Sequence, residues 1–382
     1  PRVRRQRQMC IRDSTCTVTN MAERKSRQML RRVKEINPSA VLVVCGCYAQ
    51  VAKNELEQIQ EINIILGINE KNEIVQIVEK YMEEMSEQDK RSQEAEIDDV
   101  SKQKEFLDFG DVTYTEKNRA VVKVQDGCNM FCSYCIIPYA RGRIRSRKIE
   151  SVVSEIEKIA KEGIKEVVIT GIHVASYGKD FDNENTSKKI RLIDLLEAIN
   201  KIDGIDRIRL SSLEPTIVDE EFATRLSKLD KICDHFHLSL QSGCDETLKR
   251  MNRKYTTQIY RDAVATLRKY YPEASFTTDV IVGFPGETDE EFAKTYEFLK
   301  EIDFYRLHVF KYSPRRGTVA EKMPNQIDGN EKEERSNKLI ELSNSTENKH
   351  NQSYIGKTVK VLFEEFEDGF FKGHTTNYMM VK

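Results

Sequence analysis

The sequence predicts an α/β protein in three parts: a small N-terminal α/β domain with a parallel sheet, a partial (βα)6 barrel like a TIM barrel, and the start of a C-terminal β-barrel. Three observations lead to this prediction. Strand and helix patterns alternate over residues 1–85, six further strand–helix units begin near Ala120, and an alternating strand–turn–strand pattern ends the chain.

Length and composition limit the class of protein. The chain has 382 residues, of which 39% are hydrophobic and 32% charged, with 61 Lys and Arg against 63 Asp and Glu. This balance excludes global disorder and a wholesale polycationic nucleic-acid binder, so any basic surface must be local. The longest apolar run, residues 40–45, is far too short to cross a bilayer, and no signal-peptide pattern opens the chain. We therefore expect a soluble cytoplasmic protein whose nine cysteines serve metal or redox chemistry rather than disulfides.

The N-terminal domain, residues 1–85, alternates helix and strand patterns. Its first 34 residues contain eleven Lys and Arg against two carboxylates, which makes them a candidate polyanion surface. Residues 83–105 contain thirteen charged side chains and neither Gly nor Pro, so we expect a solvated linker over residues 86–117. The expected helices are 22–36, 51–60 and 70–85, and the expected strands are 40–45 and 62–66.

The central domain, residues 118–350, repeats a strand followed by a helix. The strands are expected at 121–124, 166–170, 207–211, 235–240, 276–282 and 305–310, with helices near 149–162, 191–202, 218–229, 257–270 and 288–301. A charged, Asn-rich stretch at 325–352 is expected to separate the last domain, residues 351–382. There, strand 357–363, a turn at 367–369 and a second strand from 370 stop before a β-barrel could close, so this domain is expected to be truncated.

The strongest chemical signal is the run Cys128-Asn-Met-Phe-Cys132-Ser-Tyr-Cys135, directly after the first barrel strand. Three thiolates in one loop can bind three irons of a [4Fe-4S] cluster and leave the fourth iron open to the amino and carboxylate groups of S-adenosylmethionine. Tyr134 could stack on the adenine. A structural zinc site is the alternative, but it needs a fourth ligand, and no Cys or His lies nearby in sequence; Cys244 or a distant His could supply one only in space.

This loop, together with several other motifs, resembles the radical S-adenosylmethionine methylthiotransferase family. The resemblance runs from about Ser14 onward. It is carried by residues 127–147, Ser239-Leu-Gln-Ser-Gly-Cys244, Met251-Asn-Arg253 and Thr278-Asp-Val-Ile-Val-Gly-Phe-Pro-Gly-Glu287. It implies an enzyme that uses S-adenosylmethionine and two [4Fe-4S] clusters, the second of which takes part in sulfur insertion.

The second cluster in that family is held by three cysteines of the N-terminal domain. Cys16 in Thr15-Cys-Thr-Val-Thr-Asn20 and Cys47 in Gly46-Cys-Tyr-Ala-Gln50 match the family pattern, but the third position does not. Either the segment that carries the third ligand in the family is absent from this sequence, or Cys10 or Cys45 takes the place of that ligand. Cys45 shares a strand face with Cys47 and is better interpreted as packing. Cys233 and Cys244 are interpreted as structural.

The family branches differ in substrate. Thr170-Gly-Ile-His-Val-Ala-Ser-Tyr-Gly178, residues 15–20 and Gly373-His-Thr-Thr-Asn-Tyr378 are similar to the branch that modifies C2 of N6-threonylcarbamoyladenosine next to the anticodon of tRNA. The isopentenyladenosine branch usually has Gln-Asn where Ile172 and His173 stand. This resemblance implies tRNA, through its anticodon stem-loop, as a partner, and an electron donor such as flavodoxin or ferredoxin; neither the particular donor nor the sulfur source is indicated by the sequence.

Two segments are candidates for RNA contact. Arg141, Arg143, Arg145, Arg147 and Lys148 place five cations in eight residues beside the cysteine loop, where they could clamp phosphates, although a solvated turn would look the same. The C-terminal aromatic residues among lysines resemble the start of a TRAM domain, an RNA-binding β-barrel, although about half of them are expected to be core.

Polar residues at the ends of barrel strands are the remaining site candidates. Ser211, Glu214, Gln241 and Ser242 are expected to hold S-adenosylmethionine. His173 is as consistent with lining the pocket as with catalysis, and structural lining is favoured for His235 and His237. The competing functions are a radical enzyme that modifies RNA without inserting sulfur and a non-catalytic, cluster-bearing RNA-binding fragment. The first is disfavoured by Cys16 and Cys47.

Overall fold

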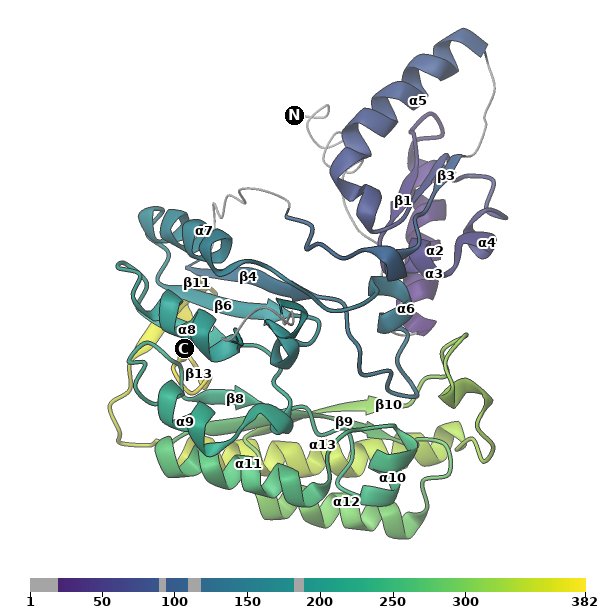
Figure 1. Ribbon diagram of the computed structural model, residues 1–382. Coiled ribbons are helices and arrows are strands. Elements are labelled where there is room, and N and C mark those ends of the chain that lie inside the picture. Colours follow the sequence, from purple (N-terminus) through teal and green to yellow (C-terminus); the bar gives the residue numbers. More distant parts are fainter. Residues whose placement is uncertain (1–19, 89–93, 109–117, 182–188) are drawn as a thin grey trace. The chain divides into compact units, whose positions relative to one another are not determined.

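The structure, a computed structural model, describes residues 20–88, 94–108, 118–181 and 189–382. It divides into two compact units, each of which takes segments from several parts of the chain (Figure 1). The first unit contains Pro1–Phe109, Gly127–Arg143 and Ser313–Glu321, and the second contains Gly110–Asp126, Ile144–Tyr312 and Lys322–Lys382.

The first unit contains the predicted parallel sheet. Strands β1 (Val43–Cys45), β2 (Ile64–Leu66) and β3 (Glu94–Glu96) pair in that order, all parallel. Its N-terminal segment contains the helices α2 (Asn20–Ile36), α3 (Cys47–Val51), α4 (Lys53–Leu56) and α5 (Ile74–Gln88), the last preceded by a 3-10 turn at Asn69–Glu73. One buried cluster of this unit takes side chains from β1, β2 and the inner faces of α2, α3 and α4, with Val44, Tyr48 and Ile65 fully enclosed.

Two expectations for this unit are wrong. The single helix expected at 51–60 is instead the pair α3 and α4, because Ala52 between them has φ −123° and ψ 31°, outside the helical region. The expected linker supplies β3, whose backbone pairs with β2, and the side chain of Val100 further along is 5% exposed. Pairing at a sheet edge uses backbone groups, so a polar composition does not prevent it.

The second unit contains the partial barrel. Strands β4 (Arg119–Asp126), β6 (Glu166–Gly171) and β7 (Arg207–Leu210) form one parallel run, and β8 (His235–His237), β9 (Ser275–Val282) and β10 (Arg306–Lys311) form another. Isolated parallel bridges, Ile208 to Ile232 and Leu213 to Leu238, join the two runs, so six parallel strands follow one another around a partial barrel. The short strand β5 (Arg145–Ser146) pairs antiparallel with the end of β4. All six predicted barrel strands are confirmed.

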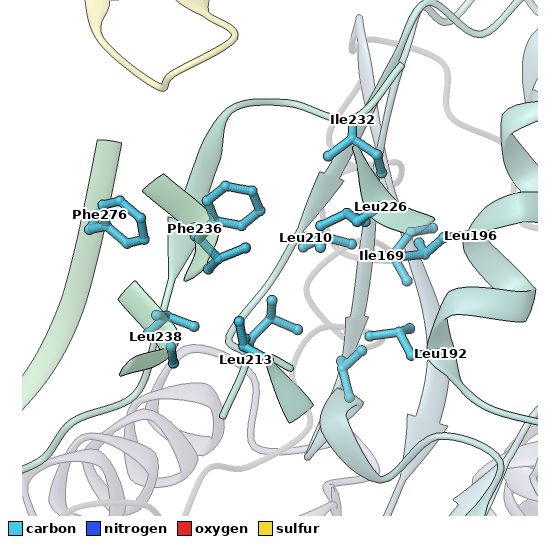
Figure 2. Close-up of a cluster of buried hydrophobic side chains, with 14 of the residues drawn as sticks. Ile169, Leu192, Leu196, Leu210, Leu213, Leu226, Ile232, Phe236, Leu238 and Phe276 are labelled. Atoms are coloured by element: carbon cyan, nitrogen blue, oxygen red, sulfur yellow. The ribbon is translucent and has the colours of Figure 1, made fainter. Parts of the chain in front are cut away.

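Helices cover the outside of this sheet. They are α7 (Ile149–Lys161), α8 (Leu192–Asn200), α9 (Glu220–Leu226), α10 (Asp245–Arg250), α11 (Thr257–Tyr270), α12 (Asp289–Ile302) and α13 (Gly329–Gln352). Figure 2 shows the core between strands and helices, where Ile169, Leu210, Phe236 and Leu238 lie among buried leucines. Burying aliphatic side chains from both layers supplies most of the stabilisation of such a domain.

The stretch expected to separate the last domain is mostly helix α13, so that expectation is wrong. Leu339 is fully buried, and Ser343 Oγ accepts a hydrogen bond from the Leu307 amide of β10 at 2.9 Å. One narrow buried stripe suffices to dock a helix whose other faces are charged, and such a stripe is easily missed in a polar sequence.

The chain ends in the antiparallel strands β11 (Val361–Glu367), β12 (Phe370–Thr375) and β13 (Met380–Val381). Asp368 and Gly369 have φ of 54° and 84°, as a two-residue type I′ hairpin turn requires. Arg207 and Arg209 of β7 donate hydrogen bonds to carbonyls of His374, Thr375 and Thr376, so these strands belong to the second unit. No helix in the described ranges is both long and apolar enough to cross a membrane.

Candidate functional site

The cysteine loop joins β4 to the short helix α6 (Ile137–Arg141) and belongs to the first unit. Cys128 and Cys135 are half-buried, and Cys132 is buried. The Cys128 amide donates to the Gly142 carbonyl at 3.0 Å, and the Cys135 amide donates to the Cys132 carbonyl at the same distance. Backbone hydrogen bonds thus fix both ends of the loop.

Gly127 explains why the loop can turn so sharply. Its φ is 69°, and a Cβ on it would lie 1.8 Å from the Arg143 carbonyl oxygen, so only glycine fits. Within the loop, the Ser133 carbonyl accepts a hydrogen bond from the Ala320 amide at 2.8 Å. The segment at 313–321 therefore supports the loop from a distant part of the sequence.

The donor set fits an iron–sulfur cluster better than a single metal ion. In the described part of the chain, no group of three or more Cys, His, Asp or Glu side chains is arranged to hold one ion. A zinc site requires its thiolates to share one ion, whereas each thiolate of a [4Fe-4S] cluster binds its own iron. Three thiols on one short loop, two of them partly accessible, suit the second arrangement.

Of the cysteines expected at the second cluster, only Cys47 lies in the described residues; Cys10 and Cys16 lie outside them. Cys47 begins α3 and is 8% exposed. The Arg141 Nε–H donates to Cys47 Sγ at 3.1 Å, so a cation faces this sulfur. Cys45 packs beside the buried side chains of β2, and burial raises the pKa of its thiol. A raised pKa disfavours the thiolate that binds metal.

The run of five cations does not form one exposed clamp, which corrects that expectation. Arg145 is 1% exposed, with Nη2 3.7 Å from Asp126 Oδ2. Arg147 is 8% exposed and pairs with Glu155 of α7. Both guanidinium groups are buried against carboxylates of the protein itself, so they cannot reach an external phosphate. Of the five, Arg143 and Lys148 are exposed, and the Arg143 guanidinium lies 4.8 Å from the centre of the Phe131 ring.

A buried polar cluster lies where β6 and β7 end. His173 Nε2 is 3.1 Å from Glu214 Oε2, and Arg253 Nη2 donates to Glu214 Oε1 at 2.9 Å. Glu214 is 3% exposed. Burial alone would raise the pKa of this carboxyl, but the hydrogen bonds and charges of His173 and Arg253 outweigh it and lower the pKa. The cluster therefore keeps an ionised carboxylate at the carboxyl end of the barrel strands.

His173 is held from two further sides. Its backbone amide donates to Gln125 Oε1 at 2.7 Å, and its Nδ1 lies 2.6 Å from Ser176 Oγ. Ser211, at the end of β7, has a buried hydroxyl for which no hydrogen-bond partner is found in the described residues. In the sequence Arg253 stands out only as part of the motif Met251-Asn-Arg253, and no pattern there links it to Glu214, 39 residues earlier.

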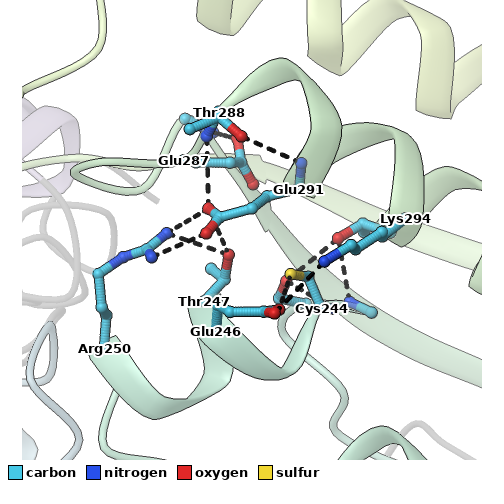
Figure 3. Close-up of polar contacts among 12 residues, drawn as sticks. Cys244, Glu246, Thr247, Arg250, Glu287, Thr288, Glu291 and Lys294 are labelled. Atoms are coloured by element: carbon cyan, nitrogen blue, oxygen red, sulfur yellow. Dashed lines mark hydrogen bonds and ion pairs between the residues drawn. The ribbon is translucent and has the colours of Figure 1, made fainter.

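Gln241 and Ser242 follow β8 in a turn that their surroundings fix. Gln241 has φ 71°, and its amide donates to the Asp279 carbonyl of β9 at 2.8 Å. Ser242 is fully buried, with Oγ 3.1 Å from Thr295 Oγ1 of α12. Figure 3 shows how the following helix α10 is tied to α12: Arg250 and Thr247 both bond the Glu291 carboxylate, and Glu246 pairs with Lys294.

The remaining candidates from the sequence are Tyr134, His235 and His237. Tyr134 is half-buried in the cysteine loop. His235 is 6% exposed and stacks on Tyr378 with ring centres 4.8 Å apart, while His237 bonds Thr277. Burial, reinforced by the charge of Arg209, lowers the pKa of His235 well below its usual value. Both histidines belong to β8, which His235 begins and His237 ends, and both bond Thr277 of the neighbouring strand β9, as expected of structural residues.

Solved structures share the fold of the barrel. The chain resembles a radical S-adenosylmethionine methyltransferase, TsrM, from Kitasatospora setae, with a TM-score of 0.56 and 16% identity over 80% of this chain and 63% of that one. The cobalamin-dependent S-adenosylmethionine radical enzyme OxsB matches with a TM-score of 0.50 and 13% identity over 86% of this chain and 46% of the other. At such identities these likenesses show the fold alone. The radical SAM superfamily model matches residues 122–299, and the model of the uncharacterized protein family UPF0004 matches residues 8–67.

Sequence relatives narrow the class to a family. Two threonylcarbamoyladenosine tRNA methylthiotransferases called MtaB are each 39% identical to this chain. The match to the Bacillus subtilis protein covers 96% of this chain and 80% of that protein, and the match to the Aquifex aeolicus protein covers 97% of this chain and 86% of that protein. A tRNA-2-methylthio-N(6)-dimethylallyladenosine synthase of Thermoanaerobacter is 37% identical over 92% of this chain and 73% of that protein. The chain belongs to the radical S-adenosylmethionine methylthiotransferase family. It is an enzyme, and its cofactors are S-adenosylmethionine and [4Fe-4S] clusters, of which methylthiotransferases carry two.

Proposed function

We propose that this enzyme adds a methylthio group to C2 of N6-threonylcarbamoyladenosine in tRNA. The observation that carries the proposal is the 39% identity, over nearly the whole chain, to two proteins named for that activity. The 37% identity to a protein named for dimethylallyladenosine supports the second candidate substrate, isopentenyladenosine. The shared chemistry in either case is methylthiolation of a hypermodified adenosine.

In this proposal Cys128, Cys132 and Cys135 hold the cluster that binds S-adenosylmethionine. When bound, that cluster supplies the electron that cleaves the sulfonium bond. The loop supports this role because its backbone is fixed at both ends while two of its thiols stay partly accessible. Cys16 and Cys47 hold the second cluster, with Cys10 as the candidate third ligand.

The buried cluster of His173, Glu214 and Arg253 is proposed to bind the cofactor's polar groups. An ionised carboxylate such as Glu214 can accept hydrogen bonds from an ammonium or from ribose hydroxyls, and Arg253 keeps it in one orientation. Tyr134, Ser211, Gln241 and Ser242 complete the proposed cofactor contacts. Ser211 is supported by its buried hydroxyl, which can donate to a ligand.

The deciding experiment compares two RNA substrates. The anaerobically reconstituted protein, S-adenosylmethionine and a reductant are incubated with tRNA that contains threonylcarbamoyladenosine or, separately, isopentenyladenosine, and nucleosides are analysed by mass spectrometry. Methylthiolation of the first tRNA supports the proposal. Methylthiolation of the second alone assigns the other substrate, and RNA binding without either product or 5′-deoxyadenosine would indicate a non-catalytic fragment.

Iron content tests the cluster assignments in the same preparation. With four irons per cluster, about eight irons per chain should fall to about four in a Cys128→Ala, Cys132→Ala, Cys135→Ala variant. About four falling to near zero would mean that only the first cluster assembles. Such a protein could cleave S-adenosylmethionine but should not insert sulfur.

A further inference from the structure

The exposed face of helix α2 has an unusual charge pattern. Of the six Lys and Arg in this helix, two turn inward and are bonded: Arg27 Nη1 donates to Tyr48 Oη at 2.7 Å, and Lys34 Nζ donates to the Ala40 carbonyl at 2.7 Å. The other four are exposed, and no ion pair or hydrogen bond is found for them within the described part of the chain. These four, named here the α2 cation patch, are Arg24, Lys25, Arg31 and Arg32.

The geometry of the helix places the four cations in two rows. Arg24 and Arg31 are seven residues apart, as are Lys25 and Arg32, so each pair lies on one side of the helix at a separation of about 10.5 Å along the axis. The opposite side is anchored, because Leu30 is 7% exposed in the core of the first unit. The patch is therefore presented to solvent by a docked helix.

On two helices of the second unit, by contrast, exposed lysines are paired. On or beside the helices α12 and α13, lysines pair with carboxylates at 2.8 to 3.3 Å; examples are Lys294 with Glu246, Lys300 with Glu297, Lys338 with Glu334, and Lys349 with Asp303. In α2 the carboxylate of Glu23 is engaged by Arg315, and Glu35 is the only other one in the helix. In a chain with 61 basic and 63 acidic residues, such a local excess is a departure that ordinary solubility does not require.

We propose that the α2 cation patch binds phosphates of the tRNA backbone. This inference rests on the proposed function, because it takes tRNA as the substrate. Three of the four cations are arginines, whose planar guanidinium groups bond phosphate oxygens in pairs. The patch offers no aromatic side chain for stacking, so it contributes affinity and orientation rather than recognition of the modified base.

The test measures how tRNA binding depends on salt. A variant with Arg24→Gln, Lys25→Gln, Arg31→Gln and Arg32→Gln is compared with the reconstituted wild-type chain by fluorescence anisotropy over a range of salt concentrations. Each lost phosphate contact removes about 0.9 from the slope of log K against log salt for a duplex and about 0.7 for a single strand. Loss of four contacts should flatten the slope by about 3, so that binding near 0.1 M salt weakens by up to about a thousandfold if the two proteins bind equally at 1 M salt.

A matched control separates specific contact from loss of general charge. It carries Lys294→Gln, Lys300→Gln, Lys338→Gln and Lys349→Gln, which remove four positive charges from exposed, ion-paired positions. We expect this control to keep the wild-type slope. Equal slopes for wild type and the α2 variant, or an equal loss in both variants, would overturn the proposal.

Two further outcomes are distinguishable. If the wild type forms methylthiolated nucleoside and the α2 variant binds tRNA normally, the proposed function stands and this inference fails. If the α2 variant binds tRNA normally but is reduced more slowly by an acidic electron-transfer protein, the patch serves a protein partner, which also refutes the inference. Circular dichroism and thermal unfolding of the variants establish that each is folded.

Discussion

Glu166, the first residue of β6, is fully buried among three arginines. Its carboxylate lies 2.7 Å from Arg209 Nε, 3.6 Å from Arg207 Nη1 and 3.8 Å from Arg119 Nη1. Arg209 in turn donates to the carbonyls of Thr375 and Thr376, so this one carboxylate supports both the barrel and the docking of the C-terminal strands. We predict that Glu166→Gln strongly destabilises the second unit.

The magnitude follows from the environment of Arg209, whose side chain is 4% exposed. Removing one partner of a buried ion pair leaves the other charge uncompensated and costs about 3 to 5 kcal/mol. A domain is stable by only about 5 to 15 kcal/mol, so this loss is a large fraction of the total. An exposed pair, such as Arg261 with Glu301, contributes about 0 to 1 kcal/mol and provides the control, Glu301→Gln.

Native-state hydrogen exchange is the suitable assay, because a chain of two units need not unfold in one step. Backbone amides of β7 and β12 should exchange about a hundredfold to a few thousandfold faster in Glu166→Gln, since about 1.4 kcal/mol is a factor of ten. Amides of β1 and β2 in the first unit should be unaffected. If β7 exchange changes by less than threefold, or if Glu301→Gln produces an equal change, the reasoning about buried charge at this position is wrong.

Three further predictions concern the loop, pH and the cofactor turn. Gly127→Ala should lose most of the iron of the first cluster, because a Cβ there would clash with the Arg143 carbonyl. Gly163 also has a positive φ but has open space around it, so Gly163→Ala should lower the free energy of unfolding by only about 1 to 2 kcal/mol and keep the iron. Iron analysis after reconstitution checks both variants. Because the pKa of His235 is depressed in the folded protein, the unfolded chain binds a proton at this residue more readily than the folded chain does below about pH 6.5. The free energy of unfolding should therefore fall by up to about 1.4 kcal/mol per pH unit between pH 6.5 and 5. In denaturant titrations, His235→Gln should flatten this pH dependence. Thr295→Val removes the hydroxyl that bonds Ser242 Oγ and the Gly243 amide, so it should weaken S-adenosylmethionine binding measured by calorimetry. The control Thr288→Ala, at the exposed start of α12, should leave this binding unchanged.

The sequence alone determined the features that are local along the chain. The spacing of Cys128, Cys132 and Cys135 carried the chemistry, and period-two and period-3.6 patterns located the six barrel strands and the helices that follow five of them. The hairpin turn at Asp368 and Gly369 was equally readable, because both residue types tolerate positive φ. Family motifs supplied the cofactors.

Only the tertiary structure decided which charged residues face solvent. Arg145 and Arg147 look the same in sequence as Arg143, yet the first two are buried against carboxylates of Asp126 and Glu155 that sequence patterns do not link to them. The same holds for α13 and β3, where a few buried or backbone contacts from distant segments fix structure in charged, polar sequence. Burial and ion pairing depend on neighbours far apart in the chain, and for that reason the α2 cation patch could be separated from the other cations only once the fold was known.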